Sequence, residues 1–202
     1  MQVADLHFPL LGDVMRADYA WPLWQALNEL LPWLQEEDSA AILPLKGTTP
    51  GDGQLFLGKR AQLILRLPQE RHAASAEALA GARLELGRQQ QAELRLGNPS
   101  RRELRPTSAQ YSPLVVLEHG DEPGFLRECE RQLEAIEVSG SLVCGRQACL
   151  RGEEELRGYS LMLHGLSAEH SLRLQQLGLG RGRKLGCGIF VAHKTARAVA
   201  TN

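Results

Sequence analysis

The sequence predicts an α+β protein made of two ferredoxin-like units in tandem, followed by a glycine-rich loop. Two observations predict this class. In the first half of the 202-residue chain, segments with strand-like and helix-like apolar spacing follow the order strand, helix, strand, strand, helix, strand, and the second half repeats it. A polar stretch, 97–110, separates the halves. Hydrophobic residues make up 43% of the chain, which is enough for real cores.

The first half begins with an apolar run at 6–11, which we expect to be a strand. Leucines then recur at helical spacing, at positions 23, 27, 30, 31 and 34. Asp18 is placed to cap this helix, and Pro32 should end or distort it. Later segments are predicted as a strand at 40–45, a loop at 46–53, a strand at 62–67, a helix at 70–80, and a strand pair at 82–86 and 92–96.

The second half repeats these elements after the polar stretch. Strands are predicted at 114–117, 141–150, 158–163 and, last, 188–193. A helix at 125–136 has an apolar stripe, and a second helix at 168–177 begins after Ser167, a good N-cap. We therefore expect one unit at 1–98, a linker at 99–110, a second unit at 111–194 that includes the glycine-rich loop 178–188, and a tail at 195–202.

Composition indicates an intracellular protein without a metal site. The four cysteines, at 129, 144, 149 and 187, form no Cys-x-x-Cys pair, and no histidines cluster around them. The N-terminus lacks the features of a signal peptide, and no apolar run approaches the ~18 residues that cross a bilayer. We expect a cytoplasmic protein with no membrane contact, no metal and no cofactor.

Charge is segregated along the chain, although the net charge is only −1. Residues 118–137 contain seven acids and two arginines, whereas residues 173–197 contain six bases and no acid. Residues 95–105 contain four bases and one acid. A local basic surface attracts phosphates even where the whole molecule is nearly neutral.

The glycine-rich segment near the C-terminus reads Gly178-Leu179-Gly180-Arg181-Gly182-Arg183-Lys184-Leu185-Gly186-Cys187-Gly188-Ile189-Phe190. Glycines leave backbone amides accessible, and the three cations supply charge, so the segment is suited to bind phosphates, most simply those of RNA. No Ser or Thr follows Lys184, which excludes a Walker loop, and the position after a helix excludes a dinucleotide fingerprint. A glycine helix stop followed by a solvated basic tail is the other interpretation.

With this C-terminal block, the chain closely resembles the CRISPR-associated endoribonucleases that cut repeat RNA, in a short variant. Weaker matches run along the whole chain in a consistent order: Asp5-Leu6 to Gly12, Ala17-Asp18, Leu31-Pro32-Trp33-Leu34, Pro44-Leu45-Lys46-Gly47, Leu63 to Pro68, Leu96-Gly97-Asn98-Pro99, Glu128 to Leu133, and Gly165-Leu166-Ser167 to Leu174.

The resemblance implies a specific activity. Members bind the stem-loop of the repeat RNA and cut its 3′ flank without metal, by attack of a ribose 2′-hydroxyl on the adjacent phosphate. Many members stay bound to the mature guide RNA as a subunit of a CRISPR interference complex. Histidines are expected at three positions that hold Tyr19, Gln35 and Leu43 here. Tyr19 and Lys46 are left as the catalytic candidates.

The candidate RNA-binding residues come from three stretches. They are Lys59 and Arg60 in a turn; Arg101, Arg102 and Arg105 in the polar stretch; and Gly178, Gly180, Arg181, Gly182, Arg183 and Lys184 in the terminal loop. We expect the terminal loop and the arginines near 101 to line one cationic surface. For the arginines, a solvated linker is the alternative. Of the six histidines, which are all expected to be structural, His119 and His193 are best placed to face RNA.

Two functions therefore stand as hypotheses. The first is a metal-independent endoribonuclease that processes CRISPR repeat RNA. The second, favoured by the missing histidines, is a weakly active or inactive hairpin-binding subunit of an interference complex. A third interpretation, in which the glycine-rich loop only contacts other proteins, has less support.

Overall fold

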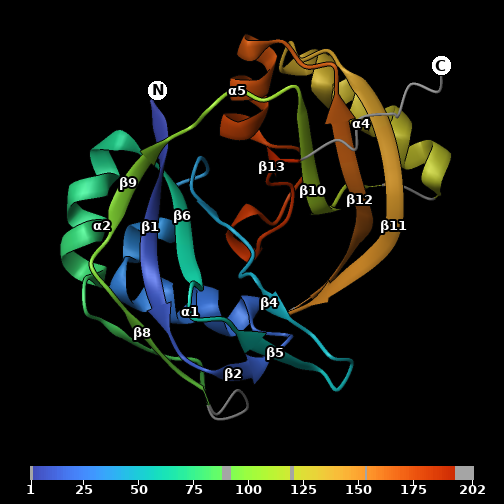
Figure 1. The fold of residues 1–202 in the computed structure, drawn as a ribbon. Coiled ribbons are helices and arrows are strands. Elements are labelled where there is room, and N and C mark those ends of the chain that lie inside the picture. Colours follow the sequence, from blue (N-terminus) through green and yellow to red (C-terminus); the bar gives the residue numbers. More distant parts are fainter. Residues whose placement is uncertain (1, 88–91, 119–120, 153, 194–202) are drawn as a thin grey trace, which may run out of the picture. The chain divides into compact units, whose positions relative to one another are not determined.

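The computed structural model describes residues 2–87, 92–118, 121–152 and 154–193 (Figure 1). The chain divides into two compact units, and each is assembled from several segments. The first unit comprises residues 1–104, 149–157 and 182–187, and the second comprises residues 105–148, 158–181 and 188–202.

The main sheet of the first unit is antiparallel around β1 (Val3–Leu11). The order is β3-β6-β1-β8-β7, and β9 also pairs with β1. The other strands are β3 (Ala41–Ile42), β6 (Gln62–Pro68), β7 (Arg83–Glu85), β8 (Glu93–Leu96) and β9 (Ser100–Glu103). A second, three-stranded sheet has the order β2-β5-β4, with β2 at Val14–Arg16, β5 at Gln54–Leu57 and β4 at Gly47–Thr48.

The helices of the first unit cover one face of the main sheet. Helix α1 (Ala20–Leu30) buries Leu23 and Leu27, which join a core with Leu6, Phe8 and leucines of β6. Pro32 begins a 3-10 turn, η1 (Pro32–Gln35), so α1 ends before it as predicted. A second 3-10 turn, η2 (Gln69–Arg71), leads into α2 (His72–Leu79).

The prediction that Asp18 caps α1 is wrong. The N-cap residue is Tyr19, and no side chain caps the helix. The Asp18 carboxylate accepts two hydrogen bonds from the Arg16 guanidinium, at 2.9 and 2.7 Å. An ion pair with a neighbour two residues away has thus replaced the cap.

The second unit is centred on β10 (Ala109–Val115) in a sheet of order β11-β12-β10-β13. The other elements of this series are α4 (Glu122–Ala135), β11 (Ser141–Arg151), β12 (Glu155–His164), α5 (Ala168–Leu177) and β13 (Val191–Ala192). The end of β11 and the start of β12, within 149–157, belong to the first unit. Phe125, Cys129 and Leu133 form the buried stripe of α4, as their spacing predicts. The Ser167 hydroxyl accepts from the His170 amide, which confirms it as the N-cap of α5.

The two main sheets share one topology, which confirms the predicted α+β class with tandem ferredoxin-like units. The strand, helix, strand, strand, helix, strand series is β1, α1, β3, β6, α2, β8 in the first unit and β10, α4, β11, β12, α5, β13 in the second. In both sheets the first strand of the series lies between the third and the fourth, and the second strand lies beyond the third.

Several local predictions need correction. Residues 46–53, predicted as a loop, contain β4, and residues 99–110, predicted as a linker, contain β9 and the start of β10. Strands β2 and β5 were not predicted, and the last strand is only Val191–Ala192. The predicted domain bounds, 1–98 and 111–194, stay a prediction. Among the described helices, none has the length and apolar character needed to span a bilayer.

Candidate nucleic-acid interface

Five glycines of the glycine-rich loop have positive φ angles. Gly178, Gly180, Gly182, Gly186 and Gly188 all have φ between 65° and 89°, a region that side chains disfavour. A Cβ on Gly188 would lie 1.9 Å from the Leu179 carbonyl oxygen, and one on Gly180 would lie 2.2 Å from the Val116 oxygen. These glycines are therefore required by backbone shape and close packing.

Most amides of the loop bind protein acceptors, which corrects the expectation that glycines leave them available for phosphate. The donors are Gly178, Leu179, Gly180, Arg181, Leu185, Gly186, Cys187 and Gly188, at 2.7 to 3.3 Å. The Gly180 amide, for example, donates to the Gln132 side-chain oxygen at 2.9 Å, and the Gly188 amide donates to the Leu114 carbonyl at 2.7 Å. An RNA role for the loop glycines stays a prediction.

Two predicted RNA-binding cations anchor the loop within the first unit. Both lie on η3 (Arg183–Leu185), a 3-10 turn that contacts β3 and α1. Lys184 Nζ donates to the Gln35 carbonyl, and Arg183 Nη2 donates to the Ser39 carbonyl at 3.4 Å. Burial, with a smaller effect of nearby Arg66, lowers the pKa of Arg183 to about 10. Arg183 therefore stays charged at neutral pH inside the protein.

A small cleft of the first unit brings together residues that are far apart in the sequence. Tyr19, Ala20 and Leu23 of the α1 region, Ile42, Leu43 and Pro44, and Lys184, Leu185 and Gly186 line it. Tyr19 and Lys184, predicted for catalysis and for RNA binding respectively, thus line one site. Lys46 does not line the cleft, but it follows Leu45, whose amide donates to the Tyr19 hydroxyl at 2.8 Å.

The environment of Tyr19 keeps its phenol protonated. Burial raises the pKa of Tyr19, and the hydrogen bond from the Leu45 amide opposes this only in part. A neutral phenol whose oxygen already accepts a hydrogen bond can still donate its own proton. The geometry therefore favours Tyr19 as a donor and disfavours it as a base.

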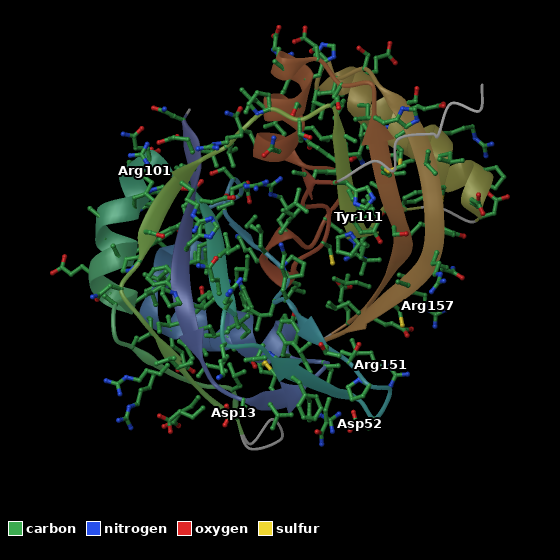
Figure 2. The ribbon with its side chains drawn as sticks, in the orientation of Figure 1. Asp13, Asp52, Arg101, Tyr111, Arg151 and Arg157 are labelled. Atoms are coloured by element: carbon green, nitrogen blue, oxygen red, sulfur yellow. The ribbon has the colours of Figure 1, made fainter. Side chains whose placement is uncertain are left out.

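The arginines near residue 101 differ in their surroundings. Arg101, on β9 (Figure 2), forms an ion pair with Glu103 at 2.6 Å. Arg102 is exposed and lies opposite Asp5 of β1. Arg105 is also exposed. Strands β1 and β6 lie between β9 and β3, the strand that η3 contacts. The expectation that Arg101 and Arg102 line one surface with the terminal loop stays a prediction.

Three further predicted cations are exposed. Lys59 and Arg60 lie in the turn after β5, and Lys46 precedes β4. None of the three forms an ion pair with a carboxylate in the part of the chain that the structure describes. Arg181 is exposed as well, and its backbone bridges to Val116. These cations are suited to phosphate contact.

A buried ion pair lies on the main sheet of the first unit, and sequence reasoning missed it. Arg66 Nε and Nη2 donate to the two Asp5 oxygens at 2.7 and 3.0 Å, and the Arg66 side chain is only 2% exposed. The two residues lie opposite each other on β6 and β1. The sequence shows one charged residue within each of two apolar strands, Asp5 and Arg66. It does not show the strand register that places them opposite each other.

Three of the described histidines form hydrogen bonds within the protein. His7 and His72 are buried and bond to Gln62 and to the Leu67 carbonyl, while His170 bonds to Ser139. His193 is exposed, with its ring 5.4 Å from that of Tyr111. His119 lies outside the described residues. No histidine is among the residues that line the Tyr19 cleft.

Possible metal ligands do not cluster in the described part of the chain, where no group of three or more His, Cys, Asp or Glu residues could hold an ion. All four cysteines are described, and none is in a disulfide. Burial raises the pKa of Cys129 to about 12, so this thiol stays protonated.

Sequence comparison identifies relatives over nearly the whole chain. The family model described as Cas6 Crispr matches residues 4–195. A CRISPR-associated endonuclease Cas6 of Myxococcus xanthus (strain DK1622) is 37% identical over 204 residues, which cover 100% of this chain and 86% of that protein.

Solved structures share the fold at low sequence identity. A Cas6-related protein from Pyrococcus furiosus has a TM-score of 0.67 and 14% identity, over 94% of this chain and 98% of that one. A CRISPR-associated protein Cas6 has a TM-score of 0.66 and 10% identity, over 96% and 100% of the two chains. Thermus thermophilus Cse3 bound to an RNA that represents a pre-cleavage complex has a TM-score of 0.51 and 15% identity, over 95% and 98%.

Proposed function

Because the chain belongs to the Cas6 CRISPR family, we propose that it binds the stem-loop of CRISPR repeat RNA and cleaves it. The observation that carries the proposal is the 37% identity to a CRISPR-associated endonuclease over the whole chain, with the family model spanning residues 4–195. Since repeat RNA is transcribed in the cytoplasm, we expect the reaction there. The structure supports the proposal with three exposed cations that form no ion pair with a described carboxylate, Lys46, Lys59 and Arg60, on a first unit whose cleft is lined by Tyr19.

The proposed reaction is attack of a ribose 2′-hydroxyl on the adjacent phosphate without metal, which gives a 2′,3′-cyclic phosphate and a free 5′-hydroxyl. Negative charge develops on the phosphate oxygens, and the leaving 5′-oxygen must gain a proton. Lys46 would stabilise the charge. Tyr19 would donate the proton, since burial keeps its phenol neutral and the Leu45 amide fixes its oxygen. No imidazole lines the cleft to accept the 2′-hydroxyl proton, so that proton would pass to water, and the Tyr19 phenolate would regain its proton from water. We therefore expect slow turnover.

Incubation of labelled repeat RNA with the protein in EDTA tests this function. We expect a product that ends in a 2′,3′-cyclic phosphate. Tyr19→Phe should slow cleavage at least tenfold while the affinity for RNA stays within about twofold, because one proton donor is lost. Lys46→Ala should also slow cleavage. Cleavage at the wild-type rate by both variants would exclude these two residues from the chemistry.

The second candidate is a hairpin-binding subunit that does not cut. The lack of a histidine at the Tyr19 cleft favours it. Tight binding with no product over hours would support this function and exclude the first. Under both candidates we propose that the protein stays attached to the mature RNA and joins other CRISPR interference subunits. Product RNA that binds as tightly as the precursor would support retention, whereas rapid release of product would contradict it.

A further inference from the structure

The three-stranded sheet of the first unit has one buried face and one open face. On β2, Met15 is 2% exposed and the adjacent Val14 is 41% exposed; on β5, Leu55 is 5% exposed and the adjacent Phe56 is 44% exposed. Since successive side chains point to opposite faces of a strand, Met15 and Leu55 face the core. The open face therefore presents a large aromatic ring.

Strand register places Lys46 on that open face. Phe56 lies opposite Val14 on one side and opposite Thr48 on the other. Gly47, between Lys46 and Thr48, lies on the inner face, where an added Cβ would be 2.5 Å from the Phe56 carbonyl oxygen and 2.6 Å from Leu55 Cδ1. Because residues that flank a strand position share a side, Lys46 and Thr48 both point outward. Lys46 is then a diagonal neighbour of Phe56, within reach of a long side chain.

The charge around Phe56 favours an anionic ligand. Lys46, together with Lys59 and Arg60 just beyond the end of β5, forms no ion pair with a carboxylate in the described ranges. Arg16, also on the open face, is neutralised by Asp18. The Asp52 carboxylate, in the β4–β5 loop (Figure 2), accepts a hydrogen bond from the Gln54 amide at 3.0 Å and so caps its own loop.

We propose that Phe56 stacks on an unpaired base of the RNA, while Lys46 binds a neighbouring phosphate. An exposed ring beside a cation on an open sheet is the arrangement with which proteins hold single-stranded RNA, because every base offers a flat face. The inference rests on the proposed function, in which Lys46 acts at the cut phosphate. The stacked base then belongs to the unpaired flank that contains the cut, since a paired base inside the stem has no exposed face.

Two RNAs test the proposal: the repeat stem-loop with its unpaired 3′ flank, and the same stem-loop without it. Phe56→Ala should weaken binding of the flanked RNA about tenfold and leave binding of the bare stem-loop unchanged. Phe56→Trp should retain the affinity. A 2-aminopurine in the flank should be quenched by the wild type and by Phe56→Trp, but not by Phe56→Ala. The matched control is Leu177→Ala, which removes a residue 51% exposed on α5 of the second unit.

The outcomes separate this inference from the function on which it rests. Suppose that the wild type binds the bare stem-loop and that Phe56→Ala binds the flanked RNA as tightly as the wild type does. The stacking proposal is then wrong, and the proposed function stands. If the wild type binds neither RNA, both are wrong. If Phe56→Ala changes only the oligomeric state, the open face is a protein contact, which also overturns the proposal.

Discussion

At the scale of single residues, two glycines with similar backbone angles have different surroundings. Gly188 has φ +65° and an added Cβ would lie 1.9 Å from the Leu179 oxygen, whereas Gly165 has φ +74° and no atom within 4 Å of that position. Both Gly188→Ala and Gly165→Ala incur the left-handed strain of about 1 to 2 kcal/mol. Gly188→Ala also creates a backbone clash. In urea unfolding, it should therefore lower the free energy of unfolding by at least ~1 kcal/mol more than Gly165→Ala does. Equal losses would contradict this account of the loop.

A second residue-scale contrast concerns ion pairs. Asp5→Asn removes a charged partner of the buried Arg66, so we expect it to lower the free energy of unfolding by about 3 kcal/mol. Asp18→Asn removes the partner of Arg16 in a pair whose side chains are 56% and 42% exposed. This variant should lower the free energy of unfolding by less than ~1 kcal/mol. Urea denaturation of both variants measures the difference. A loss below 1 kcal/mol for Asp5→Asn would show that the buried pair does not need its charge.

The thiols give a prediction that depends on pH. Burial raises the pKa of Cys129 from 9.0 to about 12, while Cys149 is exposed. Iodoacetamide at pH 8 should therefore modify Cys149 first and Cys129 only after unfolding, as read by mass spectrometry. The neutral buried thiol favours the folded state fully below pH 9, and this contribution is lost as pH rises from 9 toward 12. Early modification of Cys129 in the native protein would contradict its burial.

The sequence pointed to candidate residues of the cleft, but it did not predict which groups the backbone amides of the glycine-rich loop bind. The family resemblance singled out Tyr19 and the glycine-rich motif singled out Lys184, and both side chains line one cleft in the structure. Local spacing could not show that the loop amides donate to Leu114, Val116 and Gln132, since those acceptors depend on tertiary folding. Phe56 was missed because its strand has only four residues and no distinctive pattern.

At the scale of elements, the turn after β5 should carry more of the RNA affinity than arginines in ion pairs. The double variant Lys59→Ala with Arg60→Ala should reduce the slope of log Kd against log salt by about 0.7 to 0.9 per cation. The control removes Arg131 and Arg173, which pair with Glu128 and Glu137, and should leave the slope unchanged. Filter binding at several salt concentrations measures both, and identical slopes would place the phosphate contacts elsewhere.

Helices and strands whose signals lie within their own residues were predicted more accurately than those that depend on pairing with distant segments. Helix α5 was predicted with its correct bounds because periodicity and the Ser167 cap both lie within or beside it. Strands β4 and β9 have two and four residues, and they are strands only because β5 and β1 pair with them. Pairing of that kind depends on distant chain segments, so a solvated loop or linker was the natural interpretation.

At the scale of the whole molecule, the first compact unit contains segments from both halves of the chain. The repeated topology was predictable because each half carries its own series of periodic segments. The return of two later segments to the first unit was not predictable, because nothing in the composition of 149–157 or 182–187 marks them as parts of that unit. In that unit, an added Cβ on Gly152 would lie 3.5 Å from the Trp21 Cβ, and one on Gly186 would lie 3.2 Å from Pro44 Cγ, so both returning segments pack closely there.

This discontinuity affects how the protein matures on the ribosome. Small proteins often fold from the N-terminus as they are made, but here residues 182–187 must be synthesised before the unit formed mainly by residues 1–104 is complete. At translation rates of about 5 to 20 residues per second, that interval is roughly 4 to 17 s. Throughout it, the nascent first half lacks its last packing partners, so chaperone binding and aggregation of the nascent chain should concentrate in this period.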